Sequence, residues 1–172
     1  MPERVIRHRR VEDDGWRTLG VAADEDLSQL PAGPVIVPLT VWKTRRDELV
    51  ERGDVGVWLR PEDDPDELRA DLARLALLAV HFPKFGDGRG YSTAALLRRR
   101  GYRGELRAFG DVGRDQLYFL SRVGFDAFRL ADHRDPEAAL AAFDDFTLHY
   151  QGSVDDPTPL FRRRAVTPGA PR

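Results

Sequence analysis

The stretch Leu75–Ser92, LALLAVHFPKFGDGRGYS, decides the fold, because a buried strand in it leads directly into a glycine-rich loop. The run Leu75–Phe82 is nearly all apolar, as expected for a strand of a parallel sheet that is covered on both faces. A helix continuing from Asp66 through Val80 is the alternative interpretation, and it would remove this strand. We predict the strand, followed by the loop and by a helix that has Ser92 as its N-cap.

An alternation of short apolar runs with helical patterns continues on both sides of this stretch. Five strands are predicted to begin near Val35, Val55, Leu75, Glu105 and Phe125. Glycines that favour helix ends follow three of the helical segments, at Gly53, Gly101 and Gly124. The pattern predicts an α/β fold with a mostly parallel sheet of about five strands, right-handed crossovers and helices on both faces. A partial barrel is the alternative topology.

The two ends of the chain differ from this alternating pattern. Residues 4–21 predict a hairpin, since two polar-apolar runs flank Asp14-Gly15, a pair favoured in type I′ turns. We therefore divide the chain into an N-terminal hairpin and connector (1–34), an α/β domain (35–150) and a flexible tail rich in arginine and proline (151–172).

The composition narrows the classes of function. A formal net charge of −2 at pH 7 argues against a nucleic-acid binder, which would carry a net basic field. No run approaches the roughly 20 apolar residues of a membrane span, and the charged start of the chain does not fit a signal peptide. We expect a soluble cytoplasmic protein whose partners include neither nucleic acid nor a membrane.

Cysteine is absent from the sequence. The protein therefore has no thiolate nucleophile, no zinc–thiolate site and no cysteine-ligated iron–sulfur cluster. If it takes part in redox chemistry, the electrons must pass through an organic cofactor or through a partner. The four histidines are scattered without an i, i+4 pair, so we predict no metal site.

The loops after the predicted strands carry the candidate functional residues, because ligands bind at the carboxyl edge of such sheets. The loop Lys84–Ser92 has three glycines at alternating positions, which let a ligand approach the main chain. Lys84 and Arg89 would then hold a phosphate, sulfate, sulfite or carboxylate group. The alternatives are a plain tight turn and a salt bridge between Asp87 and Arg89. The loops after the fourth and fifth strands add further charged residues, namely Asp111, Arg114, Asp132, His133 and Arg134.

Two motifs, HFPKFGDGRGYS at His81–Ser92 and GELRAFGDVGRDQLYFLSRVGFDAFRL at Gly104–Leu130, resemble a bacterial domain-of-unknown-function family. The resemblance spans roughly residues 55–150. Members of that family are often labelled probable oxidoreductases involved in sulfite reduction. The resemblance implies an accessory or redox protein of assimilatory sulfite reduction. The alternative is a non-catalytic adaptor that docks onto sulfite reductase or a related sulfur-assimilation protein.

This resemblance adds a candidate ligand, a small oxyanion such as sulfite. It assigns neither a catalytic residue nor a cofactor. The candidate ligand-binding residues all belong to the two motifs: Lys84, Asp87, Gly88, Arg89, Gly90, Tyr91, Ser92, Arg107, Asp111 and Gln116.

Overall fold

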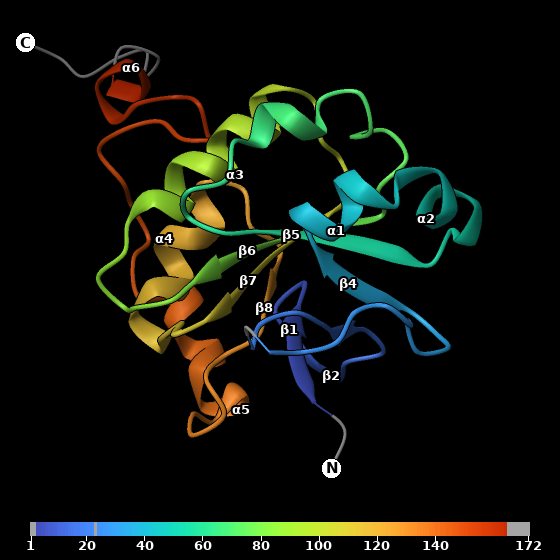
Figure 1. Ribbon diagram of the computed structural model, residues 1–172. Coiled ribbons are helices and arrows are strands. Elements are labelled where there is room, and N and C mark those ends of the chain that lie inside the picture. The colour runs from blue at the N-terminus through green and yellow to red at the C-terminus, as the bar shows by residue number, and fades with distance from the viewer. Residues whose placement is uncertain (1–2, 23, 165–172) are drawn as a thin grey trace, which may run out of the picture.

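The computed structural model describes residues 3–22 and 24–164 (Figure 1). Within these residues, eight strands form one sheet in the order β2-β1-β8-β7-β6-β5-β4-β3. The strands from β3 to β8 are parallel to one another, whereas β1 is antiparallel to both β8 and β2. The bounds are β1 Arg4–Arg7, β2 Arg10–Asp13, β3 Arg17–Thr18, β4 Val35–Pro38, β5 Val55–Leu59, β6 Leu77–Phe82, β7 Glu105–Gly110 and β8 Ala127–Phe128.

The five predicted strands are present as β4 to β8, and they are parallel to one another. The stretch Leu77–Phe82 is a strand, so the helical alternative for this part of the chain is wrong. The predicted number of about five strands is too low. The N-terminal segment adds β3 at one edge of the sheet and the antiparallel hairpin β1-β2 at the other. The sheet is therefore mixed.

Short helices connect the parallel strands. The α-helices are α1 Leu39–Thr44, α2 Arg46–Arg52, α3 Arg89–Arg99, α4 Leu117–Arg122, α5 Pro136–Ala139 and α6 Leu160–Arg164. The 3₁₀ turns are η1 Pro65–Leu68, η2 Arg114–Gln116 and η3 Leu140–Asp144. Gly53, Gly101 and Gly124 follow α2, α3 and α4 with positive φ angles of 78°, 88° and 110°, which confirms the three predicted helix ends. None of the helices among the described residues is long and apolar enough to cross a membrane.

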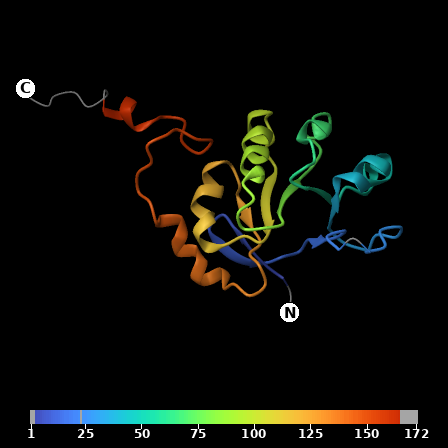
Figure 2. The same cartoon turned by 60° about the vertical axis from the view of Figure 1, so that its left-hand side comes forward.

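The helices cover one face of the sheet, and the prediction of helices on both faces is wrong. Strands β4 to β8 are neighbours in chain order. Since parallel crossovers are nearly always right-handed, each connection then falls on the same side. The sheet curves into an open half-barrel with the helices outside (Figure 2), which corresponds to the partial-barrel alternative.

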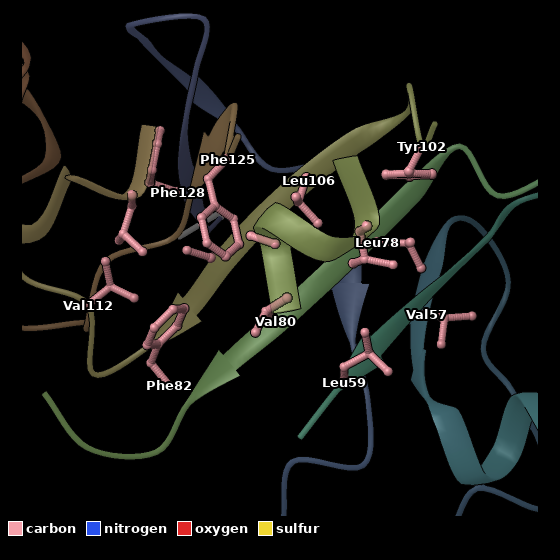
Figure 3. Close-up of a cluster of buried hydrophobic side chains, with 14 of the residues drawn as sticks. Val57, Leu59, Leu78, Val80, Phe82, Tyr102, Leu106, Val112, Phe125 and Phe128 are labelled. Carbon is pink, nitrogen blue, oxygen red and sulfur yellow. The ribbon is translucent and has the colours of Figure 1, made fainter. Parts of the chain in front are cut away.

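The hydrophobic core is divided between the two faces. On the outer face, Val80 and Leu106 pack with helix residues such as Leu97 of α3 in one large cluster (Figure 3). The face turned away from the helices, here called the inner face, carries a smaller cluster. It contains Ile36, Trp58, Leu77, Ala79 and Phe109, with Trp16 packed against it.

The N-terminal hairpin exists, but its turn is not at Asp14-Gly15. The chain turns at His8-Arg9, whose φ angles are 50° and 60°. Asp14 instead points to the inner face, where its carboxylate lies 2.6 Å from the guanidinium of Arg107. Both side chains are fully buried. The hairpin register is therefore set by this ion pair and not by local turn preference.

The segment after η3 runs back along α4. Ser153 Oγ and the Val154 N–H both donate to the carbonyl oxygen of Arg122, at 2.8 and 3.1 Å. The last part of the predicted tail, 165–172, lies outside the described residues.

Candidate functional site

The loop Lys84–Ser92 leaves the carboxyl end of β6, at the predicted edge of the sheet. Two hydrogen bonds tie it to the segment after β7. The Phe85 N–H donates to Oδ2 of Asp111 at 3.0 Å, and Nε2 of Gln116 donates to the Phe85 carbonyl oxygen, also at 3.0 Å. The structure therefore brings Asp111 and Gln116 next to the loop, where they support its backbone.

Asp87 and Arg89 bind each other within the loop. Nη2 of Arg89 lies 2.7 Å from Oδ2 of Asp87, and Nε lies 3.0 Å from Oδ1. The hydrogen bonds from Arg89 hold the pKa of the Asp87 carboxyl group below its ordinary value. The salt bridge named as an alternative is thus formed, and it neutralises the charge of Arg89.

Lys84, unlike Arg89, has no carboxylate partner within the described residues. Its side chain is exposed, and no residue of the described part of the chain forms an ion pair with it. The other lysine of the sequence, Lys43, is paired with Glu67. Lys84 therefore supplies the free positive charge of the loop.

The helix after the loop begins earlier than predicted. Helix α3 starts at Arg89 with Gly88 at its N-cap, so the assignment of Ser92 as the cap is wrong. Ser92 lies in the first turn and is exposed. The early start places Gly90, a residue without a side chain, in the first turn and over Phe82 of β6.

A Cβ atom on Gly90 would lie 2.5 Å from Cζ of Phe82, which is only 1% exposed. The ring of Tyr91 packs edge-on against the same phenylalanine, with 5.9 Å between the ring centroids. Burial raises the pKa of Tyr91 above its ordinary value. Gly90 and Tyr91 therefore join the loop to the core.

Arg107 does not lie with the loop. It is fully buried on the inner face of β7, between Ala79 of β6 and Ala127 of β8. Its guanidinium is bound by Asp14 at 2.6 Å and by Glu105 at 2.8 Å. Of the predicted site residues, Arg107 is the one that the structure separates from the others.

A cleft of about 610 Å³ opens on the inner face at the carboxyl ends of β6, β7 and β8. Asp111 lines it and connects it to the loop. The sequence pattern had placed Asp132 and His133 at this edge, and both line the cleft. Sequence reasoning did not assign to the site His81 of β6, Phe109 of β7 and Arg129, which directly follows β8.

The sequence did contain a signal for the two strand residues, His81 and Phe109. In a barrel, alternate strand residues point inwards, and those near the carboxyl ends face the usual ligand site. The partial-barrel alternative, applied to β6 and β7, would have predicted that His81 and Phe109 face this ligand site. No cluster of three or more residues suited to holding a metal ion occurs in 3–22 and 24–164.

The fold and the carboxyl edge of the sheet together define the class of protein. It is an α/β half-barrel with a loop and a cleft at the carboxyl ends of its strands. Residues 56–161 match a family described as bacterial protein of unknown function (DUF934), and the chain belongs to that family. The match includes the loop and most of the parallel sheet, and it leaves out the N-terminal hairpin. No curated protein matches the chain.

Proposed function

We propose that the protein is an accessory or redox protein of assimilatory sulfite reduction that binds a small oxyanion at the loop Lys84–Ser92. The pathway is supported by the resemblance of this loop and of Gly104–Leu130 to the family labelled in that way. The observation that carries the binding site is the exposed ammonium group of Lys84, which has no ion-pair partner within the described residues.

The backbone of the loop suits an anion as well. Gly86 and Gly88 lie in open space, since a Cβ atom on either would meet nothing within 4 Å. Helix α3 begins directly after them without an acidic residue in its first turn. Its first N–H group, that of Arg89, donates to Oδ1 of Asp87 at 3.2 Å, and the N-terminus of the helix favours negative charge. An oxyanion beside Lys84 would therefore meet an ammonium group and open peptide groups.

Titration calorimetry with sulfite, sulfate and phosphate tests the site. We expect Lys84→Ala to weaken binding about tenfold or more, because a charge-assisted hydrogen bond is lost. Arg89→Ala should weaken it as well, since it removes a cation and leaves the Asp87 carboxylate unpaired. Lys43→Ala is the matched control, because Lys43 is paired with Glu67 outside the loop. No heat from the unaltered protein with any of the three anions would refute the binding site.

The adaptor alternative is favoured by an exposed aromatic patch, formed by Tyr118 and Phe119 of α4 and by Phe146. The ring of Phe146 lies 4.9 Å from Tyr118 and 5.6 Å from Phe119 between centroids. Phe119 and Phe146 are 48% and 52% exposed. Exposed apolar groups that cluster in this way mark protein–protein contacts. Under this alternative, the patch and not the loop carries the role in sulfite reduction.

A further inference from the structure

The cleft on the inner face lies next to the loop, to which Asp111 connects it, but it is not part of the oxyanion site proposed above. Its volume of about 610 Å³ falls within the range of small-molecule sites. It opens at the carboxyl ends of parallel strands, where curved and open α/β sheets bind ligands. The two parts of its lining have different chemistry.

Aromatic rings line the floor of one part of the cleft. The rings of His81 and Phe109 lie 4.9 Å apart with 32° between their planes, and Trp58 meets both edge-on at 5.7 Å. Burial, together with the nearby charge of Arg60, lowers the pKa of His81 below its ordinary value, so its imidazole is neutral at pH 7. The uncharged imidazole of His81, which lies over Phe109, is a surface on which a planar ring would stack.

The other part of the cleft carries several arginine side chains. An adjoining hollow of about 360 Å³ shares five lining residues with the first, including Arg129 and Asp132, so the two are continuous. Arg4, Arg129 and Arg134 line this hollow, against the carboxylates of Glu3 and Asp132. Each of the three has a carboxylate partner, since Arg4 pairs with Glu137, Arg129 with Glu3 and Arg134 with Asp111.

These arginines keep capacity for a ligand. The Arg134 guanidinium lies 3.6 Å from its carboxylate partner Asp111, and its buried Nε atom has no hydrogen-bond partner within the described residues. Arg129 is bound by Glu3, whose side chain is half exposed. A phosphate group offers oxygen atoms to several guanidinium donors at once, and it would compete well with such surface carboxylates.

We propose that the cleft binds a small molecule in which a planar heteroaromatic ring is joined to a phosphate group, that is, a mononucleotide. The ring stacks on His81 above Phe109, and the phosphate accepts hydrogen bonds from Arg134 and Arg129. Asp132, at the boundary of the two hollows, accepts from an N–H group of the ring. A flavin mononucleotide in this place would supply the redox group that a chain without cysteine does not provide from its own thiols.

Calorimetric titration of the full chain with flavin mononucleotide, adenosine monophosphate, riboflavin and inorganic phosphate tests this proposal. We expect saturable binding of at least one of the two mononucleotides. Riboflavin should bind at least about tenfold more weakly than flavin mononucleotide because it lacks the phosphate, and inorganic phosphate should bind most weakly because it lacks the ring.

Three variants separate the two parts of the cleft. Arg134→Gln should weaken mononucleotide binding about tenfold and leave riboflavin unchanged. His81→Ala should weaken both by about two- to tenfold. Arg9→Gln, in an exposed ion pair with Asp144 outside the cleft, should change neither. Circular dichroism of each variant identifies loss of fold. Failure of the unaltered protein to bind either mononucleotide overturns the proposal, as does equal binding of riboflavin and flavin mononucleotide that Arg134→Gln does not alter.

Discussion

Replacing Arg107 with methionine is expected to lower the free energy of unfolding by about 3–5 kcal/mol. The side chains of Arg107 and Asp14 are both fully buried, and Glu105 completes the ion pairs at the rim. Methionine is an unbranched, adaptable side chain that fills much of the same space. The loss therefore comes from leaving the Asp14 carboxylate buried without its cation. Urea denaturation followed by circular dichroism measures it.

Two further variants control this result. Combining Arg107→Met with Asp14→Leu removes both buried charges and should restore most of the lost stability. Asp144→Ala breaks the exposed ion pair with Arg9, whose side chains are 79% and 61% exposed, and should cost below about 1 kcal/mol. A loss for Arg107→Met no larger than that for Asp144→Ala would show that the buried pair does not stabilise the hairpin against the sheet.

Gly110→Ala is expected to lower the free energy of unfolding by roughly 2–5 kcal/mol, from two separate causes. Gly110 ends β7 with a φ of 103°, which L-residues rarely adopt. A Cβ atom there would also overlap the carbonyl oxygen of Phe82 and lie 2.9 Å from Cδ2 of His81. Since both neighbours belong to β6, the carboxyl ends of the two strands would have to separate.

Two other glycines separate these causes. Gly101 has a φ of 88° but open space around it, so Gly101→Ala carries the backbone strain alone and should cost about 1–2 kcal/mol. Gly86 has open space and no such φ, so Gly86→Ala should be close to neutral. Thermal and urea denaturation of the three variants should rank them in this order. An effect of Gly110→Ala equal to that of Gly86→Ala would contradict the close approach of β7 to β6.

The parallel strands could be predicted because each is a run of buried residues bounded by polar segments. That pattern does not reveal what covers each face. In β6, Leu78 and Val80 pack under the helices, whereas Leu77 and Ala79 belong to the inner-face cluster. Both sets are apolar, so the sequence is equally consistent with helices on two faces and with the half-barrel that is present.

The N-terminal segment could be predicted only in part, because long-range contacts decide its register. Asp14-Gly15 is a favourable turn pair by local preference. In the folded chain, Asp14 is needed opposite Arg107, which is 93 residues away in sequence. The turn therefore moves to His8-Arg9, and β3 pairs with β4 over two residues, Arg17 and Thr18. No local signal marks a pairing this short.

The position of the candidate loop followed from strand order in the sequence, but its internal pairing did not. Arg89 and Lys84 are both basic residues of one loop, and composition alone makes them equivalent. The structure distinguishes them, because Arg89 is bound by Asp87 whereas no described residue forms an ion pair with Lys84. The cleft was missed because its floor comes from inward-facing strand residues, whose direction depends on the curvature of the sheet.

We propose that the loop Lys84–Ser92 is the working site of a protein of sulfite reduction. A strain lacking the gene allows a direct measurement, which is the growth rate on sulfite as sole sulfur source. We expect the deletion to impair growth and added cysteine to restore it. The unaltered gene and Lys43→Ala should both complement the deletion, whereas the double variant Lys84→Ala with Arg89→Ala should fold normally and fail to complement it.

Failure of the double variant Phe119→Ser with Phe146→Ser to complement, together with growth of the loop variant, would favour the adaptor alternative. Unimpaired growth of the deletion strain on sulfite would contradict the assignment to this pathway.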